Sequence, residues 1–301
     1  MEIIKILGVS KDYLWGGQTL KKFGKTGGDI IAESWDLSLN KDGESIVDSG
    51  KDKGKKLSKV FKKKDWGSLC QNFPFFPTLI KYIDSKKNLS IQVHPSDQYA
   101  LKYENSFGKT EMWFVVKANK NASLFVGLKK DTKKSEIKKA LKEGKITSLL
   151  NKFKVKEGDC FLIPSGTIHA INEGCLILEI QQNSNLTYRL FDYNRKDKNG
   201  NLRELHIDKA LKVIDTKKYI VQKSKSSLLF KSKYFSTYKF ILKKEISFPA
   251  TKETFMCLNF YEGKGKINNL NFKKGDSFLV PINNEVKILG TGKFLLTKIE
   301  K

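Results

Sequence analysis

The sequence predicts a mainly β protein made of two related barrels, with a few helices. Runs rich in β-branched and aromatic residues recur along most of the 301 residues, and only two stretches show the spacing of amphipathic helices. One strand unit also occurs twice, because KVKEGDCFLIP (154–164) returns as NFKKGDSFLVP (271–281). In each copy a Gly-Asp pair indicates a turn, the apolar run indicates a buried strand, and a proline ends it. A repeated strand unit in a β-rich chain favours two barrels of common design.

The predicted strands follow one another closely in the first 130 residues. DIIAESWDLSL (29–39) alternates well enough for a strand, and FFPTLIKYID (75–84) and LSIQVHP (89–95) predict two strands joined by a polar turn. EMWFVVKA (111–118) and ASLFVGL (122–128) are strong β runs, because aromatic and β-branched residues fill them.

Two helices interrupt the strands. Helical spacing covers residues 131–153, with Asp131 or Thr132 as the expected N-cap, and a second amphipathic helix is expected over residues 205–215. Between them, and again from about residue 227 to the end, the chain returns to strand-like runs.

The histidines distinguish the two barrels. No histidine follows His206, and when the two copies of the repeat are aligned His169 falls on Val286. Only the first barrel can therefore carry a histidine metal site. We expect a metal-binding domain over residues 1–234, helices included, and a smaller C-terminal β domain over residues 235–301 without metal ligands.

The net charge of +25 suggests nucleic acid at first sight. All but three of the 57 basic residues are lysines, however, and they are spread along the whole chain. Nucleic-acid-binding proteins favour arginine for bidentate contacts to bases and phosphates. We therefore expect no specific nucleic-acid partner, only weak attraction to polyanions.

Neither a membrane nor a secretory route is indicated. No apolar run reaches 18 residues, and the N-terminal residues lack the apolar centre of a signal peptide. The four cysteines are scattered without a C-x-x-C pair. They are expected to be reduced thiols in the cytoplasm, and not metal ligands.

A metal site is suggested first by LSIQVHP. Residues two apart on a strand point to the same face, so Gln92 and His94 project together while Ile91 and Val93 point the other way, into packing. Taken alone, the pair is also compatible with an ordinary buried histidine.

Two further residues strengthen the metal hypothesis. Glu111 begins a strong strand in GKTEMWFVV, and His169 follows a turn in IPSGTIHAI. Imidazole, carboxylate and amide oxygen together suit Zn²⁺ and leave a coordination position open, although two histidines and a carboxylate also suit Fe(II). A site with one anionic ligand stays positive and can act on hydroxyl or carbonyl oxygens.

The segment LEIQQNSNLTYRLFDYNR (178–195) adds reactive groups. Glu179 ends an apolar run, and Arg189 is one of only three arginines. An arginine kept in a lysine-rich chain indicates a need for its planar fork, either in a salt bridge or at a site. Arg195, in a polar turn, is expected at the surface.

These motifs, taken in order, resemble the class I mannose-6-phosphate isomerases, above all the short bacterial form. The resemblance covers nearly the whole chain and rests on the following segments: YLWGG (13–17), ESWDLS (33–38), FPTLIKYID (76–84), LSIQVHPSDQYA (89–100), GKTEMWFVV (108–116), IPSGTIHAI (163–171) and LEIQQNSNLTYRLFDYNR (178–195). It implies cupin (jelly-roll) barrels and one Zn²⁺ per chain. It also implies interconversion of mannose 6-phosphate and fructose 6-phosphate through a cis-enediol.

The resemblance also implies roles for individual residues. The zinc ligands would be Gln92, His94, Glu111 and His169. The conserved arginine would be Arg189 and the active-site glutamate Glu179, ten residues before it. Lysines near the phosphate and the metal would be Lys81 and Lys109, with Ser90 beside the metal strand. One departure is Asn185, which stands where family members commonly have an acid.

Several alternatives remain open. Glu179 is the preferred base, because burial raises a carboxylate's pKa, but Lys109 is a rival, because nearby Zn²⁺ lowers a lysine's pKa. The chain is also compatible with another metal-dependent cupin enzyme, such as an Fe(II) oxygenase, or with a non-catalytic cupin that binds sugar phosphates. The expected partner is a small sugar phosphate, and the expected assembly is a monomer or homodimer.

Overall fold

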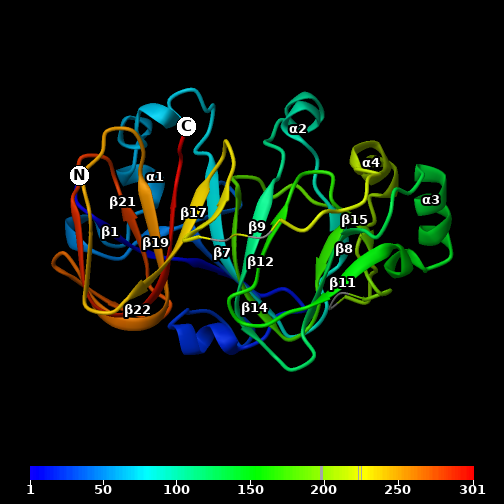
Figure 1. The fold of residues 1–301 in the computed structure, drawn as a ribbon, viewed down its shortest axis with the longest axis horizontal. Coiled ribbons are helices and arrows are strands. Elements are labelled where there is room, and N and C mark those ends of the chain that lie inside the picture. The colour runs from blue at the N-terminus through cyan, green and yellow to red at the C-terminus, as the bar shows by residue number, and fades with distance from the viewer. Residues whose placement is uncertain (197–198, 223, 225) are drawn as a thin grey trace.

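Three β-sheets stacked side by side form the body of the protein in the computed structural model (Figure 1). The structure describes residues 1–196, 199–222, 224 and 226–301. Within these residues, no helix has both the length and the apolar character needed to cross a membrane. The mainly β architecture predicted from the sequence is confirmed.

The central sheet has six strands. Their order across the sheet is β12 (Cys160–Ile163), β9 (Glu111–Ala118), β14 (Cys175–Gln182), β7 (Thr78–Ser85), β3 (Glu33–Leu37) and β2 (Val9–Lys11). Every residue of β7 and β14 is buried, because this sheet is covered on both faces. One face, with Ile80, Tyr82 and Leu178, packs against residues of the C-terminal sheet such as Leu279 and Leu295.

The other face of the central sheet meets a five-stranded sheet. Its order is β11 (Leu150–Lys154), β10 (Ser123–Leu128), β13 (His169–Ile171), β8 (Ile91–Val93) and β15 (Tyr188–Phe191). The outer face of this sheet is covered by helices, since Ile91 and Val93 pack in one cluster with Ile137 and Ala210. The predicted orientation of Ile91 and Val93, into packing and away from Gln92, is confirmed.

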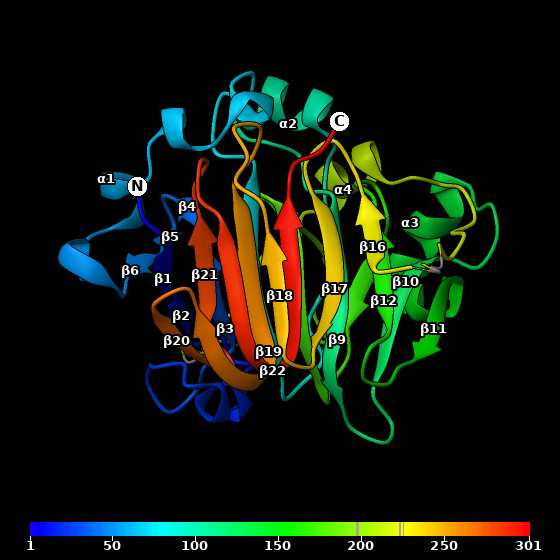
Figure 2. The same ribbon diagram turned by 60° about the vertical axis from the view of Figure 1, so that its left-hand side comes forward.

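The C-terminal sheet has nine strands and lies at the front in Figure 2. Its main path is β16 (Leu228–Lys231), β17 (Ser236–Leu242), β22 (Val286–Lys298), β19 (Met256–Ile267), β21 (Ser277–Val280), β1 (Ile4–Leu7) and β6 (Ile46–Val47). Two further strands join it: β18 (Glu245–Phe248) pairs with β22, and β20 (Leu270–Lys273) pairs with β19. The sheet therefore includes β1, β6 and β16 from before residue 234, and the division of the chain at that residue stays a prediction.

The remaining elements are short. β4 (Leu39–Asn40) and β5 (Gly43–Glu44) pair apart from the large sheets. The α-helices are α1 (Leu57–Val60), α2 (Asp97–Tyr103), α3 (Lys134–Lys142) and α4 (Ile207–Val213). Single 3₁₀ turns span Thr19–Phe23, Gly50–Asp52, Lys63–Asp65, Ser68–Cys70 and Ile146–Leu149. The helix predicted over 205–215 is thus confirmed, two residues shorter at each end.

The long helix predicted over 131–153 is wrong in extent. Helix α3 ends at Lys142, because Gly144 takes a left-handed conformation with a φ of 68° and turns the chain away. A 3₁₀ turn and strand β11 follow. The N-cap is Lys133, whose backbone N–H donates to the Glu136 carboxylate at 3.1 Å, so neither Asp131 nor Thr132 caps the helix.

The strands predicted at 75–84 and 89–95 exist, but they do not form a hairpin. β7 belongs to the central sheet, whereas β8 pairs with β13 and β15 in the five-stranded sheet. The polar segment between them therefore carries the chain from one sheet to the other. This crossing places the end of β8 opposite the central sheet.

The repeated unit has the same local structure in both copies. In each, an aspartate accepts a hydrogen bond from the lysine N–H three residues earlier, at 2.8 Å for Asp159 and 2.9 Å for Asp276. The preceding glycines, Gly158 and Gly275, have positive φ angles of 87° and 92°. A four-residue strand then follows in each copy, β12 and β21. The interpretation as two related strand units is confirmed.

The core of the C-terminal sheet is apolar. The rings of Phe260 and Phe272 stack with centroids 3.9 Å apart, and Phe278 and Phe294 pack against Phe260. Val286, the counterpart of His169, is fully buried in the same cluster. Hydrophobic side chains therefore surround Val286 in the C-terminal cluster.

Candidate metal centre and active site

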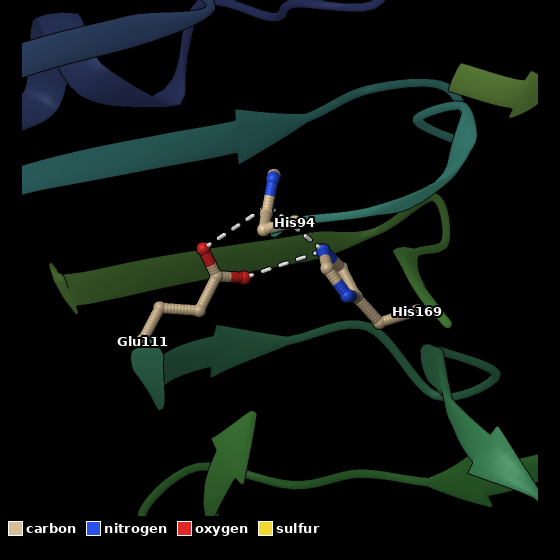
Figure 3. Close-up of side chains that lie close together, drawn as sticks. All are labelled: His94, Glu111 and His169. Atoms are coloured by element: carbon tan, nitrogen blue, oxygen red, sulfur yellow. Dashed lines mark hydrogen bonds and ion pairs between the residues drawn. The ribbon is translucent and has the colours of Figure 1, made fainter. Parts of the chain in front are cut away.

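A His-Glu-His cluster lies between the five-stranded and central sheets. His94 directly follows β8, His169 begins β13, and Glu111 begins β9. Figure 3 shows the three side chains converging, and their ligand atoms all lie within 4.8 Å of one another. The Glu111 carboxylate oxygens are each 3.4 Å from one imidazole, Oε2 from His94 Nε2 and Oε1 from His169 Nε2. The third histidine, His206, lies outside this cluster.

Backbone carbonyls fix the tautomer of both histidines. His94 Nδ1 lies 2.8 Å from the Leu186 carbonyl oxygen, and His169 Nδ1 lies 2.8 Å from that of Thr167. Because a carbonyl only accepts, each Nδ1 carries the proton and each Nε2 keeps a lone pair. The two Nε2 atoms face one another at 3.2 Å. Two lone pairs at that distance repel, and a cation shared between them removes the repulsion.

The protonation states also suit a metal. Burial, followed by the Lys109 charge, lowers the pKa of His94 to about 3, and burial also lowers the pKa of His169. Burial alone would raise the pKa of Glu111, but the nearby Lys109 ammonium holds it well below the ordinary value. Both Glu111 oxygens are buried without a hydrogen-bond donor among the described residues. Two neutral imidazoles and a carboxylate are therefore ready to bind a cation.

Gln92 supplies a fourth group. It pairs in register with His169, and its amide nitrogen lies 3.3 Å from His169 Nε2. The side-chain amide therefore reaches the cluster, and its oxygen is the atom it would offer to an ion. Two nitrogens, a carboxylate and an amide oxygen fit Zn²⁺, with room for an exchangeable ligand.

A tight loop contact positions Lys109 and Glu111. The Lys109 N–H donates to the Pro95 carbonyl at 3.0 Å, and the Gly108 N–H donates to the Asp97 carboxylate at 2.9 Å. A Cβ on Gly108 would lie 2.4 Å from the backbone of Ser96, so only glycine allows this approach. The segment after the metal-binding strand β8 thus holds the start of β9 in place.

A row of four side chains crosses the central sheet beside the cluster. Trp35, Lys81, Glu179 and Trp113 pair in register on the adjacent strands β3, β7, β14 and β9. The Trp113 indole N–H donates to Glu179 Oε2 at 2.8 Å, and Lys81 Nζ lies 3.2 Å from Glu179 Oε1. Glu179 is therefore held by Trp113 on one side and Lys81 on the other, on the face of the central sheet that packs against the five-stranded sheet.

Glu33 completes this row and was missed by the sequence reasoning. It lies two residues before Trp35, accepts a hydrogen bond from the Trp35 indole at 2.7 Å, and lies 3.3 Å from Lys81 Nζ. The motif ESWDLS contained it, but nothing in that motif shows that its carboxylate shares a lysine with Glu179. Lys81 therefore lies between two buried carboxylates.

The carboxylates next to the cluster outnumber the ammonium groups that contact them. Lys109 Nζ lies 3.3 Å from Glu111 and 3.8 Å from Glu179, so three carboxylates face only two ammonium groups. Burial and the Glu111 charge raise the pKa of Glu179, although Lys81 and Lys109 oppose the rise. Burial would lower the pKa of Lys81, but Glu179 and Glu33 raise it above the ordinary value. A raised pKa makes Glu179 a candidate for proton transfer.

A cavity of about 270 Å³ opens beside these groups. It brings together the residues predicted for catalysis and substrate binding with Gln92, while the His-Glu-His cluster is buried behind it. The lining residues are Tyr13, Trp15, Glu33, Lys81, Ile83, Leu89, Ser90, Gln92, Lys109, Ile171, Glu179, Asn185, Thr187, Arg189 and Arg203.

Arg189 lines the cavity and forms no ion pair with a carboxylate of the described residues. It pairs in register with Gln92, and its Nη1 donates to the Glu204 carbonyl at 2.7 Å. Arg195, expected at the surface, has a side chain that is 19% exposed and forms an ion pair with Asp192.

Asn185, the departure noted in the sequence, still lies beside a carboxylate. Its amide donates to Asp42 at 3.0 Å, and Asn185 lines the cavity. The acid usual at this position is thus replaced by an amide that contacts an acid from another loop.

A jelly-roll barrel with a His-Glu-His cluster that could hold a metal, next to a cavity lined by a buried carboxylate, has the architecture of an enzyme of the cupin class. No model of a protein family matches the sequence. The mannose-6-phosphate isomerase ManA of Bacillus subtilis is 37% identical, with 97% of each chain covered, and the mannose-6-phosphate isomerase of Streptococcus mutans is 34% identical, with 89% of each covered. The chain belongs to the mannose-6-phosphate isomerase family.

Solved structures agree with this assignment. The crystal structure of the Bacillus subtilis mannose 6-phosphate isomerase superposes with a TM-score of 0.88 at 34% identity, covering 99% of both chains. A zinc-bound mannose 6-phosphate isomerase has a TM-score of 0.79 at 16% identity, which shows the shared fold. The prediction of cupin barrels is confirmed.

Proposed function

We propose that this chain interconverts mannose 6-phosphate and fructose 6-phosphate by moving a proton between C1 and C2 of the open-chain sugar. The observation that carries the proposal is the placement of Glu179, a buried carboxylate with a raised pKa, in the cavity beside the His-Glu-His cluster. The relatives named for this reaction support it over nearly the full length of the chain.

The proposed metal is one Zn²⁺ per chain, held by Gln92, His94, Glu111 and His169. Its support is the donor set, the facing lone pairs of the histidines and the zinc bound by a relative of the same fold. When bound, Zn²⁺ supplies positive charge where the sugar oxygens at C1 and C2 become negative. Lys109, through its contact with Glu111, holds that ligand as a carboxylate.

Glu179 is the proposed base. The Trp113 indole holds Oε2, while Oε1 lies 3.2 Å from Lys81 Nζ and 3.8 Å from Lys109 Nζ. Oε1 can take the proton from C2, leaving the cis-enediolate, and return it to C1 on the same face after the hydroxyl proton has moved from O2 to O1. Lys109 contacts two carboxylates, an arrangement suited to donating a hydrogen bond to a substrate oxygen. Arg189, which lines the same cavity, is proposed to share the developing negative charge.

Lys81 and Ser90 are proposed to bind the substrate. Both line the cavity, and Ser90 Oγ lies 3.5 Å from the Gln92 amide oxygen. Because Glu33 and Glu179 already balance the charge of Lys81, its ammonium suits a sugar hydroxyl better than a dianion.

The assignment of the base is tested by Glu179→Gln and Lys109→Met in the zinc-loaded protein. We expect Glu179→Gln to abolish both turnover and exchange of the C2 proton with solvent deuterium, followed by NMR. We expect Lys109→Met to slow turnover while exchange continues. Near-normal exchange in Glu179→Gln, with none in Lys109→Met, would assign the base to Lys109. Oxygen uptake in place of isomerisation would indicate the Fe(II) oxygenase.

The proposed assembly and location follow from simpler observations. All four metal-binding residues and the base belong to one chain, so a monomer and a homodimer would both hold complete sites. The four cysteines are free, which supports a reducing compartment such as the cytoplasm.

A further inference from the structure

The C-terminal sheet contributes no side chain to the lining of the cavity among the described residues. One turn of this sheet nevertheless contacts the segment that follows the proposed metal-binding strand β8. Tyr234, in the turn between β16 and β17, donates a hydrogen bond from its hydroxyl to the carboxylate of Asp97 in helix α2. Asp97 lies three residues after His94, so this contact joins the C-terminal sheet to the surroundings of the metal centre.

The Asp97 carboxylate connects three segments of the chain. Its Oδ1 accepts hydrogen bonds from the Gly108 N–H at 2.9 Å and from the Gln182 side-chain amide at 2.7 Å, while its Oδ2 accepts from Tyr234. An acid in the first turn of a helix often does no more than complement the helix dipole. Here all three donors lie outside helix α2. The contacts therefore indicate a cross-link between segments.

The three hydrogen bonds also keep Asp97 ionised. Burial would raise the pKa of Asp97, but the hydrogen bonds from the tyrosine, the glutamine and the backbone lower it below the ordinary value. Lys233 Nζ lies 3.4 Å from Oδ2, but the Lys233 side chain is 70% exposed, so this ion pair adds little. The hydroxyl and the two N–H groups are thus the contacts that fix the carboxylate.

Gln182 extends this arrangement along the start of β9. Its Oε1 accepts from the Thr110 N–H at 2.8 Å, and its backbone N–H donates to the Thr110 carbonyl at 3.1 Å. Asp97 binds the backbone at Gly108, and Gln182 binds it at Thr110. The backbone is therefore held on both sides of Lys109.

Lys109 is the side chain whose position depends on this support. Its Nζ lies 3.3 Å from Glu111 and 3.8 Å from Glu179. Burial raises the pKa of both carboxylates, and the Lys109 charge opposes the rise in each. A displaced backbone at Lys109 would therefore disturb a proposed metal ligand and the proposed base together.

Tyr234 is itself held in place by two sheets. Its backbone carbonyl accepts from the Thr78 hydroxyl at 3.2 Å, and Thr78 pairs in register with Gln182 in the central sheet. The turn leads directly into β17, which pairs with β22 in the C-terminal sheet. Burial and the hydrogen bond to Asp97 raise the pKa of Tyr234, so its hydroxyl remains a donor.

We propose that Asp97 and Tyr234 are positioning residues through which the C-terminal sheet fixes Lys109 beside the metal centre and the base. The inference rests on the proposed isomerase function of the same site. Neither residue lines the cavity, and both act through the backbone of residues 108–110. The C-terminal sheet thereby contributes to the reaction although none of its strands reaches the substrate.

The test compares Tyr234→Phe with Tyr238→Phe in the zinc-loaded protein. Each variant removes one hydroxyl that donates to a carboxylate, because Tyr238 on the same sheet donates to Glu300 at 2.7 Å. We expect Tyr234→Phe to lower kcat about fivefold or more with little change in KM, since it does not touch the substrate. It should also weaken zinc binding about threefold or more, measured against a chromophoric chelator. Tyr238→Phe should change each quantity by less than about twofold.

A double variant tests whether the hydroxyl acts through Asp97. Asp97→Ala should lower kcat about tenfold or more, and adding Tyr234→Phe to it should lower kcat by less than about twofold further, because the carboxylate that the hydroxyl holds is gone. Asp97→Asn keeps an acceptor for the Gly108 N–H and should recover part of the loss. The comparison of the two tyrosines stands whether or not Asp97→Ala folds.

Two results would overturn the proposal. One is a Tyr234→Phe variant whose kcat and zinc affinity match those of Tyr238→Phe. The other is a double variant whose loss equals the product of the two single losses, which would show that the hydroxyl acts independently of Asp97. Zinc affinity keeps the test separate from the isomerase proposal. A wild-type protein that binds zinc without isomerising the sugar, while Tyr234→Phe binds zinc more weakly, would refute the function alone.

Discussion

Removing the Lys81 ammonium should destabilise the protein strongly, because two buried carboxylates depend on it. The Lys81 side chain is 7% exposed, and those of Glu33 and Glu179 are 8% and 3% exposed. Taking one partner from a buried ion pair costs about 3–5 kcal/mol, and here a single lysine serves two. We therefore expect Lys81→Met to lower the free energy of unfolding by about 4 kcal/mol near neutral pH.

The effect should be partly reversed by removing one of the carboxylates. Glu33→Gln alone should cost about 1 kcal/mol, because the amide oxygen still accepts from the Trp35 indole and Lys81 keeps Glu179. The double variant should regain about 1–3 kcal/mol over Lys81→Met, since one uncompensated charge is gone.

The assay is urea unfolding of zinc-loaded protein, followed by tryptophan fluorescence. Lys55→Met, which removes an exposed lysine paired with Asp52, is the control and should cause no measurable loss. A cost of less than about 1 kcal/mol for Lys81→Met, or a double variant no more stable than Lys81→Met, would refute the shared-lysine arrangement.

Four further predictions follow from the site and its support. The acid limb of the pH profile of kcat/KM should lie above the ordinary glutamate pKa, because activity needs ionised Glu179 and burial raises the pKa of Glu179. Lys81→Met should move this limb to still higher pH, because the nearby positive charge is lost. A shift to lower pH would contradict the assignment. His169→Ala should weaken zinc binding by at least about 100-fold in competition with a chromophoric chelator, and unchanged affinity would remove it from the ligand set. Gly108→Ala should reduce kcat, because the Cβ of the new alanine would press against the backbone of Ser96 and displace Lys109. A normal kcat would show that the loop can rearrange without moving Lys109. Phe260→Ala should lower the free energy of unfolding, measured in urea, by about 3–5 kcal/mol, while the folded protein keeps its affinity for zinc. Loss of zinc binding with unchanged stability would contradict a purely structural role for the C-terminal core.

The sequence could indicate the proposed metal-binding residues because their positions follow from local rules. Gln92 and His94 share a strand face by the period of two, and the polar residues Glu111 and His169 stand at strand starts in otherwise apolar runs. The repeated Gly-Asp turn likewise depends only on local chemistry, and it recurs with the same hydrogen bond in both barrels. Each of these predictions depends only on residues that are close together in the sequence.

The rest of the site depends on pairing between distant strands. Glu33 and Lys81 meet because β3 and β7 are neighbours in a sheet that is buried on both faces, and no spacing in either segment shows that. Arg203 reaches the cavity through a contact with Asp192 across a loop. The end of helix α3 was missed for a related reason, since Gly144 and the pairing of β11 with β10 override helical spacing.

The most direct test of the account is conversion of mannose 6-phosphate to fructose 6-phosphate by the purified protein, before and after chelation and after zinc is added back. The structure predicts activity that is lost on chelation and restored by Zn²⁺, with one zinc per chain. Full activity after complete removal of metal, or no activity with any metal while the sugar phosphate still binds, would contradict the central claim that this cluster is the metal centre of an isomerase.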